Sequence, residues 1–301
     1  MSLKILTLNT AMLPEYPIFK EEPGKYERAK KLAALINKEN YDIVCLQEVF
    51  SEEIREIFYS KLKTKLPFVR KKSGEDGLWV QDSGLFFASK YRFIGNTGII
   101  EFEYGNTADT DTQAKKGIFF SRIDLGFAGY PGVQLYCLNT HLQSGRSHRD
   151  ERRNQLREIN NLMSDLFLKL PFPENGKVYA DVLCIMLFGD LNVIGDSEEY
   201  EDMLNALSYP RDLFKKSNLS AAGFTWDGKS NSFIKDNDPD DHDQERLDYA
   251  LAFDTAPVRH EDWRKTNLKN IKCLSCNVKM FKDSKGNDLS DHYGLETVID
   301  L

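Results

Sequence analysis

The chain has 301 residues, which is long enough to bury a sizeable core and corresponds to one large layered domain or two smaller ones. Its hydrophobic fraction of 41% and charged fraction of 29% are ordinary for globular proteins, so the fibrous, disordered and membrane-spanning classes are disfavoured. The longest apolar run, at residues 182–188, is far shorter than a bilayer-spanning helix, which needs about 20 residues. The formal charge of −7 is opposite in sign to that of a protein that binds nucleic acid mainly by neutralising phosphates.

The odd number of cysteines, five, indicates free thiols rather than a disulfide framework. Cys45, Cys137 and Cys184 lie in apolar runs, so we expect them to be buried. Cys273 and Cys276 form one CxxC motif, and the second pair that a four-ligand zinc site needs is missing from the sequence. We therefore expect a reducing compartment. No signal-peptide pattern precedes Lys4, so a cytoplasmic location is the default, and secretion stays open if a native leader has been trimmed.

Hydrophobic patterning predicts the order of helices and strands. Short apolar runs bounded by turn residues predict strands at 4–8, 43–46, 85–88, 99–102, 118–123, 133–139, 182–188, 247–253 and 295–299. Apolar residues at three- and four-residue spacing predict helices at 29–36, 54–62 and 156–167, and a shorter one at 198–207. Residues 13–23 and 236–243 are expected to form a proline-bearing loop and an acidic loop.

The run at 182–188 is too apolar for a half-exposed strand, so we expect it in the centre of a sheet with both faces covered. The sequence shows neither an internal repeat nor a composition shift typical of a linker. Many strands with a few long helices favour two sheets packed together with helices outside, in one domain that spans residues 1–301.

Polar side chains with catalytic chemistry stand at the ends of the predicted strands. A rigid strand fixes the direction of the side chain that follows it, so strand ends are suitable places for a site. These residues are Asn9, Gln47 with Glu48, His141, Asp190, Asn192, and Asp291 with His292. Each alone is typical of a cap or a turn, and the set as a whole indicates a functional site.

Six motifs, in this order, resemble the endonuclease/exonuclease/phosphatase superfamily. They are Thr7-Leu8-Asn9, Leu46-Gln47-Glu48, Asn139-Thr140-His141-Leu142-Gln143, Gly189-Asp190-Leu191-Asn192, Arg246-Leu247-Asp248-Tyr249 and Ser290-Asp291-His292-Tyr293. The resemblance runs from Thr7 to Val298. It implies an α+β fold, a four-layer α/β/β/α sandwich of two mostly antiparallel sheets with helices on the outer faces.

Further motifs are similar to those of the magnesium-dependent neutral sphingomyelinases within that superfamily. They are Asp82-Ser83-Gly84-Leu85, Thr140-His141-Leu142-Gln143-Ser144, Phe224-Thr225-Trp226-Asp227 followed by Asn231-Ser232, and a stretch with Asp111, Ala114, Lys116 and Gly117. The resemblance implies hydrolysis of sphingomyelin or a related phospholipid by in-line attack of water at phosphorus, with release of the phosphorylated headgroup.

The implied cofactor is Mg2+, with Mn2+ as a possible substitute. Mg2+ in proteins is typically held by one or two carboxylates and keeps several waters. Glu48 is the first-choice ligand. By resemblance, Asn9 and Asp291 lie near the same ion, directly or through water.

The other site residues act on water and phosphate in this interpretation. His292 is the expected base, because an imidazole can take a proton near neutral pH, and Asp248 orients it. Asp190 positions the water or assists proton transfer. Asn192 and His141 are donors for the charge that builds on the phosphoryl oxygens, and Lys116 adds a positive contact.

The implied partner is a phospholipid at a membrane surface, bound peripherally at most, and we expect a monomer. Secreted bacterial members of this group use an aromatic hairpin in the interval between Asp248 and Asp291, where this chain offers mainly Trp263 and Phe281. The apolar residues at 16–19 could touch lipid or pack under the sheet edge.

Three alternatives stay open. A nuclease is disfavoured by the negative charge and by the lack of an obvious basic stripe. Arg146, Arg149, Arg153 and Arg157 could share one helix face, but interleaved acidic residues favour a solvated, internally paired face.

An inositol polyphosphate 5-phosphatase would carry an aromatic-Arg pair where this chain has Val193-Ile194. A catalytically silent lipid-binding homologue would need to have kept its polar set without chemistry.

Overall fold

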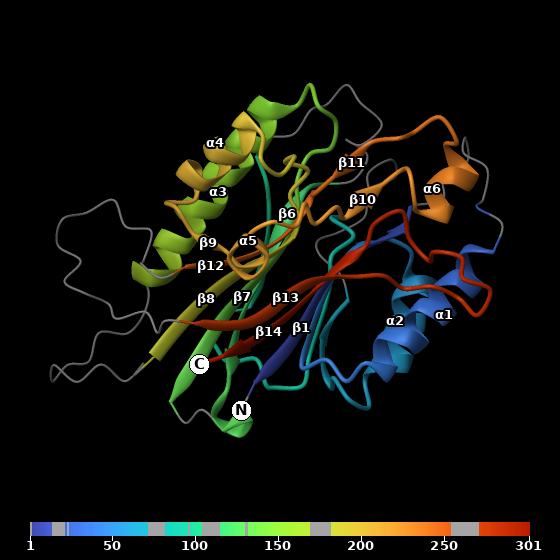
Figure 1. Ribbon diagram of the computed structural model, residues 1–301. Coiled ribbons are helices and arrows are strands. Elements are labelled where there is room, and N and C mark those ends of the chain that lie inside the picture. The colour runs from blue at the N-terminus through green and yellow to red at the C-terminus, as the bar shows by residue number, and fades with distance from the viewer. Residues whose placement is uncertain are drawn as a thin grey trace, which may run out of the picture.

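The computed structural model describes residues 2–13, 22, 24–71, 82–95, 97–103, 115–129, 132–168, 182–253 and 271–301. Two six-stranded sheets lie face to face, and helices cover their outer sides (Figure 1). Strands β1 and β2 of one sheet contact β7, β8 and β12 of the other. The predicted four-layer α+β sandwich is confirmed.

The first sheet contains both ends of the described chain. Its order is β13 (Lys272–Lys279), β14 (Gly294–Asp300), β1 (Leu3–Met12), β2 (Ile43–Val49), β4 (Phe86–Ser89) and β3 (Phe68–Arg70). Only β1 and β2 pair in parallel, and all other neighbours in this sheet are antiparallel.

The second sheet has the same balance of pairings. Its order is β5 (Gly98–Glu101), β6 (Gly117–Asp124), β7 (Val133–His141), β8 (Val182–Asp190), β12 (Asp248–Phe253) and β9 (Arg211–Asp212). Here β7 and β8 form the parallel pair. A separate two-stranded ribbon consists of β10 (Trp226–Asp227) and β11 (Gln244–Glu245).

Alternation along the central strands places one set of side chains between the sheets and the other under the helices. On β2, Ile43 and Cys45 belong to the core between the sheets, whereas Val44 and Leu46 belong to the core beneath the helices. Strand β8 behaves alike, with Met186 facing the other sheet and Leu187 facing the helices. The central position predicted for residues 182–188 is therefore confirmed.

Each sheet has its own pair of long helices. α1 (Lys25–Lys38) and α2 (Glu52–Leu62) pack on the first sheet, and α3 (Arg149–Leu168) and α4 (Glu198–Ala206) pack on the second. The remaining helices are short: η2 (Gly126–Ala128), α5 (Leu213–Ser217) and α6 (Ser232–Asn237). None of the described helices combines the length and the apolar composition that a bilayer span requires.

The two parallel pairs bring the predicted polar residues to one edge of the sandwich. Helix α1 connects β1 to β2, and α3 connects β7 to β8, so the carboxyl ends of all four strands point the same way. Asn9 pairs with Gln47 in one register, and His141 pairs with Asp190 in the other. Antiparallel β12 begins at this edge, because Asp248 pairs with Asp190.

Several described elements had not been predicted. Strand β13 was missed because polar residues and cysteines interrupt its apolar pattern, as expected for an edge strand with an exposed face. Strands β3, β9, β10 and β11 are only two or three residues long. All five cysteines are free thiols, and Cys45, Cys137 and Cys184 are buried as predicted.

Candidate active site

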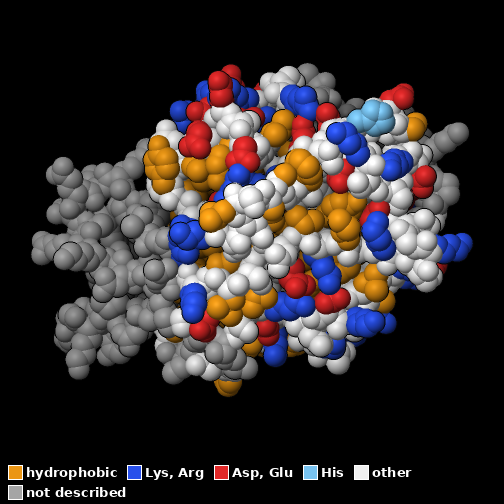
Figure 2. Space-filling model, viewed as in Figure 1, with side chains coloured by type: hydrophobic (Ala, Val, Ile, Leu, Met, Phe, Trp, Pro, Cys, Tyr) orange, Lys and Arg blue, Asp and Glu red, His pale blue; other side chains and the backbone are white. Residues whose placement is uncertain are grey.

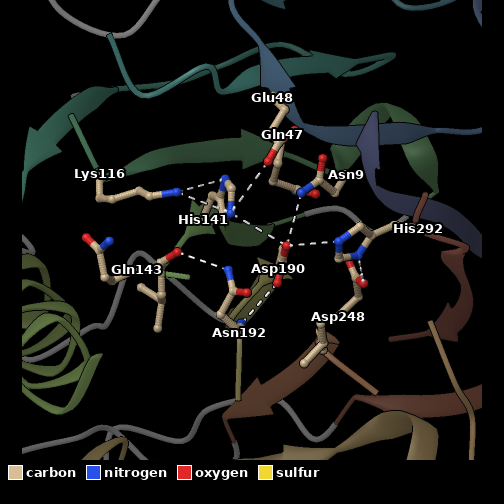
Figure 3. A network of polar contacts seen from close by, with 12 residues as sticks. Asn9, Gln47, Glu48, Lys116, His141, Gln143, Asp190, Asn192, Asp248 and His292 are labelled. Atoms are coloured by element: carbon tan, nitrogen blue, oxygen red, sulfur yellow. Dashed lines mark hydrogen bonds and ion pairs between the residues drawn. The ribbon is translucent and has the colours of Figure 1, made fainter. Parts of the chain in front are cut away.

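Seven of the nine predicted site residues line one pocket of about 610 Å³ at the shared strand edge. They are Asn9, Glu48, His141, Asp190, Asn192, Asp291 and His292. The other two are buried and hydrogen bonded to members of the set: Asp248 contacts His292, and Lys116 contacts His141 (Figure 3). The structure thus brings all nine together.

His292 and Asp248 form an imidazole–carboxylate pair. His292 Nδ1 donates to Asp248 Oδ2 at 2.8 Å, and its Nε2 lies 3.5 Å from Asp190 Oδ2. Trp226 packs edge-on against the imidazole, with ring centroids 5.2 Å apart. Burial opposes the charged imidazole, but the carboxylates of Asp248, Asp190 and Asp291 outweigh it and raise the pKa of His292 well above its ordinary value.

Asp190 lies at the centre of the polar network (Figure 3). Its Oδ1 accepts from the Asn192 backbone N–H at 3.0 Å, and its Oδ2 accepts from Asn9 Nδ2 at 3.0 Å. His141 Nε2 is 3.5 Å from the same Oδ2. Both carboxylate oxygens are therefore held by donors of this chain.

His141 connects Lys116 to the carboxylates. Lys116 Nζ lies 3.3 Å from His141 Nε2 and 3.4 Å from Nδ1, and both side chains are buried. His141 Nε2 is also 4.0 Å from Glu48 Oε1. A buried ammonium beside an imidazole gives this wall of the pocket donors that suit phosphoryl oxygens.

Glu48 and Asp291 form a pair of neighbouring carboxylates in the pocket. Burial and the charge of Asp291 raise the pKa of Glu48 to about 7. Burial likewise raises the pKa of Asp291. Glu48 also hydrogen bonds the Asn9 side chain, and its backbone has a φ of 57°, an uncommon conformation for a residue with a side chain. Two partly buried carboxylates beside an amide suit a hard divalent cation, so the residues present fit Mg2+.

A second group of potential ligands consists of Asp190, Asp248 and His292, whose polar atoms lie within 4.8 Å of one another. Most of these atoms are already engaged by hydrogen bonds within the protein, as described above. This arrangement suits a chain of proton-handling groups better than it suits an ion site.

Arg28 ties together the segments that carry Asn9 and Asp291. Its guanidinium donates to the carbonyls of Thr10, Ala11 and Leu289 at 2.8, 2.6 and 2.9 Å. Ser290 Oγ donates to the Asn9 carbonyl at 2.7 Å. These contacts hold the segment around Asn9 next to the segment that carries Asp291.

An amide pair connects the two sheets beside the site. Gln47 Nε2 donates to Asn139 Oδ1 at 2.7 Å, and Asn139 Nδ2 donates to the carbonyls of Leu46 and Phe86 at 3.1 and 3.2 Å. Both side chains are fully buried. Because Gln47 precedes Glu48 and Asn139 lies two residues before His141, this bridge sets the spacing between the two walls of the pocket.

The motif Asp82-Ser83-Gly84-Leu85 supports the strand that carries Glu48. Asp82 forms a buried ion pair with Arg55 at 2.5 Å, and Arg55 Nε donates to the Val49 carbonyl at 3.0 Å. The Val49 N–H in turn donates to the Gly84 carbonyl at 2.8 Å. The motif therefore anchors the backbone just after Glu48.

The arginine row does not form a free basic face. Arg149 pairs with Asp202 of α4, and Arg153 pairs with Asp150 and Asp202. Among the described contacts, Arg153–Asp150 is the one ion pair within the helix itself, and Asp202 of the neighbouring helix is the main partner of Arg149. Arg146 reaches across the pocket mouth to Asp243 and Glu245, a contact that sequence spacing did not reveal.

Several sequence-based expectations fall on residues outside the described part of the chain. These are the apolar residues 16–19, Trp263, and Asp111 and Ala114 of the lysine-containing stretch. Phe281 is described and is only 7% exposed, packing in the core beneath α1 and α2. It therefore does not offer the exposed aromatic surface that its sequence context had left open.

The fold and site define a hydrolase that acts at phosphorus: two packed sheets present an imidazole–carboxylate pair and a carboxylate pair to one pocket. The chain belongs to the endonuclease/exonuclease/phosphatase family, whose model matches residues 6–292. The predicted family and the predicted enzyme class, a phosphoric diester hydrolase, are confirmed.

Two sequence relatives and one solved structure extend this result. A phospholipase C of Staphylococcus aureus is 28% identical over 270 residues, covering 83% of this chain and 73% of the relative. A sphingomyelinase C of Bacillus cereus is 26% identical over 329 residues, covering 100% of this chain and 89% of the relative. A beta toxin of Staphylococcus aureus, solved with bound magnesium ions, superposes with a TM-score of 0.70 at 24% identity over 99% of each chain.

Proposed function

We propose that this chain is a Mg2+-dependent phosphodiesterase of the neutral sphingomyelinase type, which hydrolyses sphingomyelin or a related phospholipid and releases the phosphorylated headgroup. The observation that carries the proposal is the pairing of two units in one pocket. Glu48 with Asp291 supplies negative oxygen donors, and Asp248 with His292 supplies a proton acceptor next to them. Relatives named sphingomyelinase C and phospholipase C support the lipid substrate.

In this proposal Glu48, Asp291 and Asn9 hold the cation. A magnesium-bound neighbour of the same fold supports the choice of ion. When bound, Mg2+ supplies positive charge to the phosphoryl and leaving oxygens and offsets the carboxylate field around His292.

The proton steps belong to the side chains of this chain. Neutral His292 takes a proton from the attacking water through Nε2, which faces the pocket side of Asp190, while Asp248 holds Nδ1–H. Asp190 orients the water. His141, Asn192 and Lys116 lie where they can donate to, or balance, the charge that develops on phosphorus-bound oxygens.

The substrate is taken to lie at a membrane surface, with this chain bound peripherally and as a monomer. On the face drawn in Figure 2, described Lys and Arg side chains are interspersed with Asp and Glu and do not gather into one basic stripe. This face therefore offers no basic stripe for a polyanionic nucleic acid.

The experiment is a panel of phosphodiesters assayed with Mg2+ and with chelator, comprising sphingomyelin, a lysolipid, a phosphoinositide and DNA. We expect Mg2+-dependent release of phosphocholine from sphingomyelin, and no release by a His292→Ala variant. Preferred cleavage of DNA, or equal activity in chelator, contradicts the proposal.

A further inference from the structure

A short segment of the chain, residues 225–231, contacts both partners of the Asp248–His292 pair. It contains β10 and the turn before α6, and it covers most of the motif Phe224-Thr225-Trp226-Asp227 with Asn231. The proposed chemistry gives this motif no role. The contacts of this segment with Asp248 and His292 indicate a structural role for the motif.

Thr225 links the strand that carries Asp248 to the segment that carries His292. Its Oγ1 accepts from the backbone N–H groups of Leu247 and Asp248 at 3.0 and 3.1 Å. Its carbonyl accepts from the Tyr293 N–H at 2.7 Å. Thr225 is fully buried, so these groups have no access to water as an alternative partner.

The rest of the segment holds the His292 side of the pair. Trp226 forms an isolated β-bridge with His292 in addition to the ring contact. Asn231 Nδ2 donates to the carbonyls of Ser290 and Asp291, both at 3.0 Å, while its Oδ1 accepts from the Phe233 and Ile234 N–H groups in the first turn of α6. The same seven-residue segment therefore fixes the backbone on each side of the hydrogen bond.

The Asp248 carboxylate depends on this backbone support. Its Oδ2 bonds His292, whereas its Oδ1 is buried and has no hydrogen-bond partner among the described residues. No second side-chain contact in that part of the structure orients the carboxylate, so the position of its backbone decides where Oδ2 points.

We propose that Thr225 is a positioning residue for the Asp248–His292 hydrogen bond, and that Asn231 positions the opposite side. The kinetic consequence rests on the proposed function, since it assumes that this pair handles the proton. The structural consequence, a correctly aligned Nδ1–H···Oδ2 bond, does not depend on the substrate.

The test replaces Thr225 by Val, which keeps the shape of the side chain and removes the acceptor of two buried N–H groups. We expect kcat on the best phosphodiester to fall about tenfold to a hundredfold, with KM and Mg2+ affinity changed by less than about twofold. Thr225→Ser keeps the hydroxyl and should restore most of kcat. Thr297→Val is the matched control, because Thr297 is an equally buried threonine on β14 that contacts Cys276.

A substrate-free readout separates this inference from the proposed function. The downfield proton resonance of His292 Nδ1–H, assigned by its absence in His292→Ala, should shift or broaden in Thr225→Val and persist in Thr225→Ser and Thr297→Val. If Thr225→Val does not fold, Asn231→Asp tests the other arm, because it keeps the α6 cap and removes both donated bonds. An unchanged resonance with unchanged kcat in a folded variant overturns the inference. A normal wild-type resonance without activity on any phosphodiester refutes the proposed function alone.

Discussion

Two β-α-β units, one in each sheet, contribute to the site, and the polar side chains at their strand ends differ. β1, α1 and β2 present Asn9 and Glu48, whereas β7, α3 and β8 present His141 and Asp190. Asp190 has both carboxylate oxygens occupied by donors of the protein. Glu48 instead faces Asp291, and burial with that neighbouring charge raises its pKa to about 7.

This difference indicates different roles for the two carboxylates, Glu48 and Asp190. Glu48 keeps a raised pKa in spite of its hydrogen bond with Asn9, so it suits an added cation, whereas Asp190 has donors of the protein on both oxygens and suits the orientation of water and protons. The two units differ in backbone as well: Glu48 has a φ of 57°, and the residue before Asp190 is Gly189 with a φ of 146°.

The strongest challenge to the proton-handling side is removal of its imidazole. His292→Ala should lower kcat by about a hundredfold to ten-thousandfold at saturating Mg2+, the usual contribution of a positioned base. His242→Ala, an exposed histidine, is the control and should keep wild-type turnover. Steady-state kinetics on sphingomyelin measure both, and wild-type activity in His292→Ala would refute the assignment.

In the second unit, β8 approaches β7 closely at Gly189, and a methyl group at this position would disturb the contact. A Cβ at Gly189 would lie 1.9 Å from the Thr140 carbonyl oxygen, so Gly189→Ala should destabilise folding by about 4 kcal/mol. Gly286→Ala, also at positive φ but with nothing within 4 Å, should cost only about 1 kcal/mol. Urea unfolding compares the two, and equal losses would show that the contact is unimportant.

Exchanging carboxylate for amide in each unit tests which acid serves the cation. Glu48→Gln should weaken Mg2+ affinity about a hundredfold, because it removes a ligand charge. Asp190→Asn should weaken it about tenfold or less while still lowering kcat. Calorimetric Mg2+ titration of both variants decides, and a larger loss of affinity in Asp190→Asn would reverse the roles assigned to Glu48 and Asp190.

The raised pKa of Glu48 predicts a modest pH dependence. Mg2+ must displace a proton from a group whose pKa is about 7, so affinity should increase about tenfold between about pH 6 and about pH 8 and then level off. In the absence of a cation, the effect of pH on the free energy of unfolding has the opposite sign. The folded state holds this proton more tightly than the unfolded chain, so the contribution of Glu48 to stability decreases as pH rises from about 4.5 towards 7.

Titrations of Glu48→Gln provide the control, since its residual Mg2+ affinity should lose this dependence. A wild-type affinity that is flat across the same range would mean that Glu48 is already ionised there.

The central strands were predictable because both of their faces are buried. Runs such as 43–46 and 182–188 are apolar at every position, and strand-end polar residues then marked the edge where the site lies. Strand β13 shows the limit of this reasoning: Lys272 and Asn277 are exposed, so its pattern resembles a loop.

The supporting shell of the site was not predictable from local patterns. Arg28 and Arg55 are buried, although arginine usually lies at the surface. The Arg28 contact with Leu289 joins residues 261 positions apart, and no periodicity or turn signal encodes such a pairing. Asp82 and Thr225 stand in motifs that carry the family resemblance, but only the three-dimensional contacts show what these two residues do.

The amide pair of Gln47 and Asn139 has a mechanical consequence. Dispersion contacts between two apolar sheets resist separation but have little directional preference, so they offer weak resistance to sliding. The hydrogen bond from Gln47 to Asn139, at 2.7 Å, is directional and therefore resists sliding of one sheet over the other beside the site. Loss of this hydrogen bond would let the two walls of the pocket shift relative to each other while the two sheets stayed folded and packed.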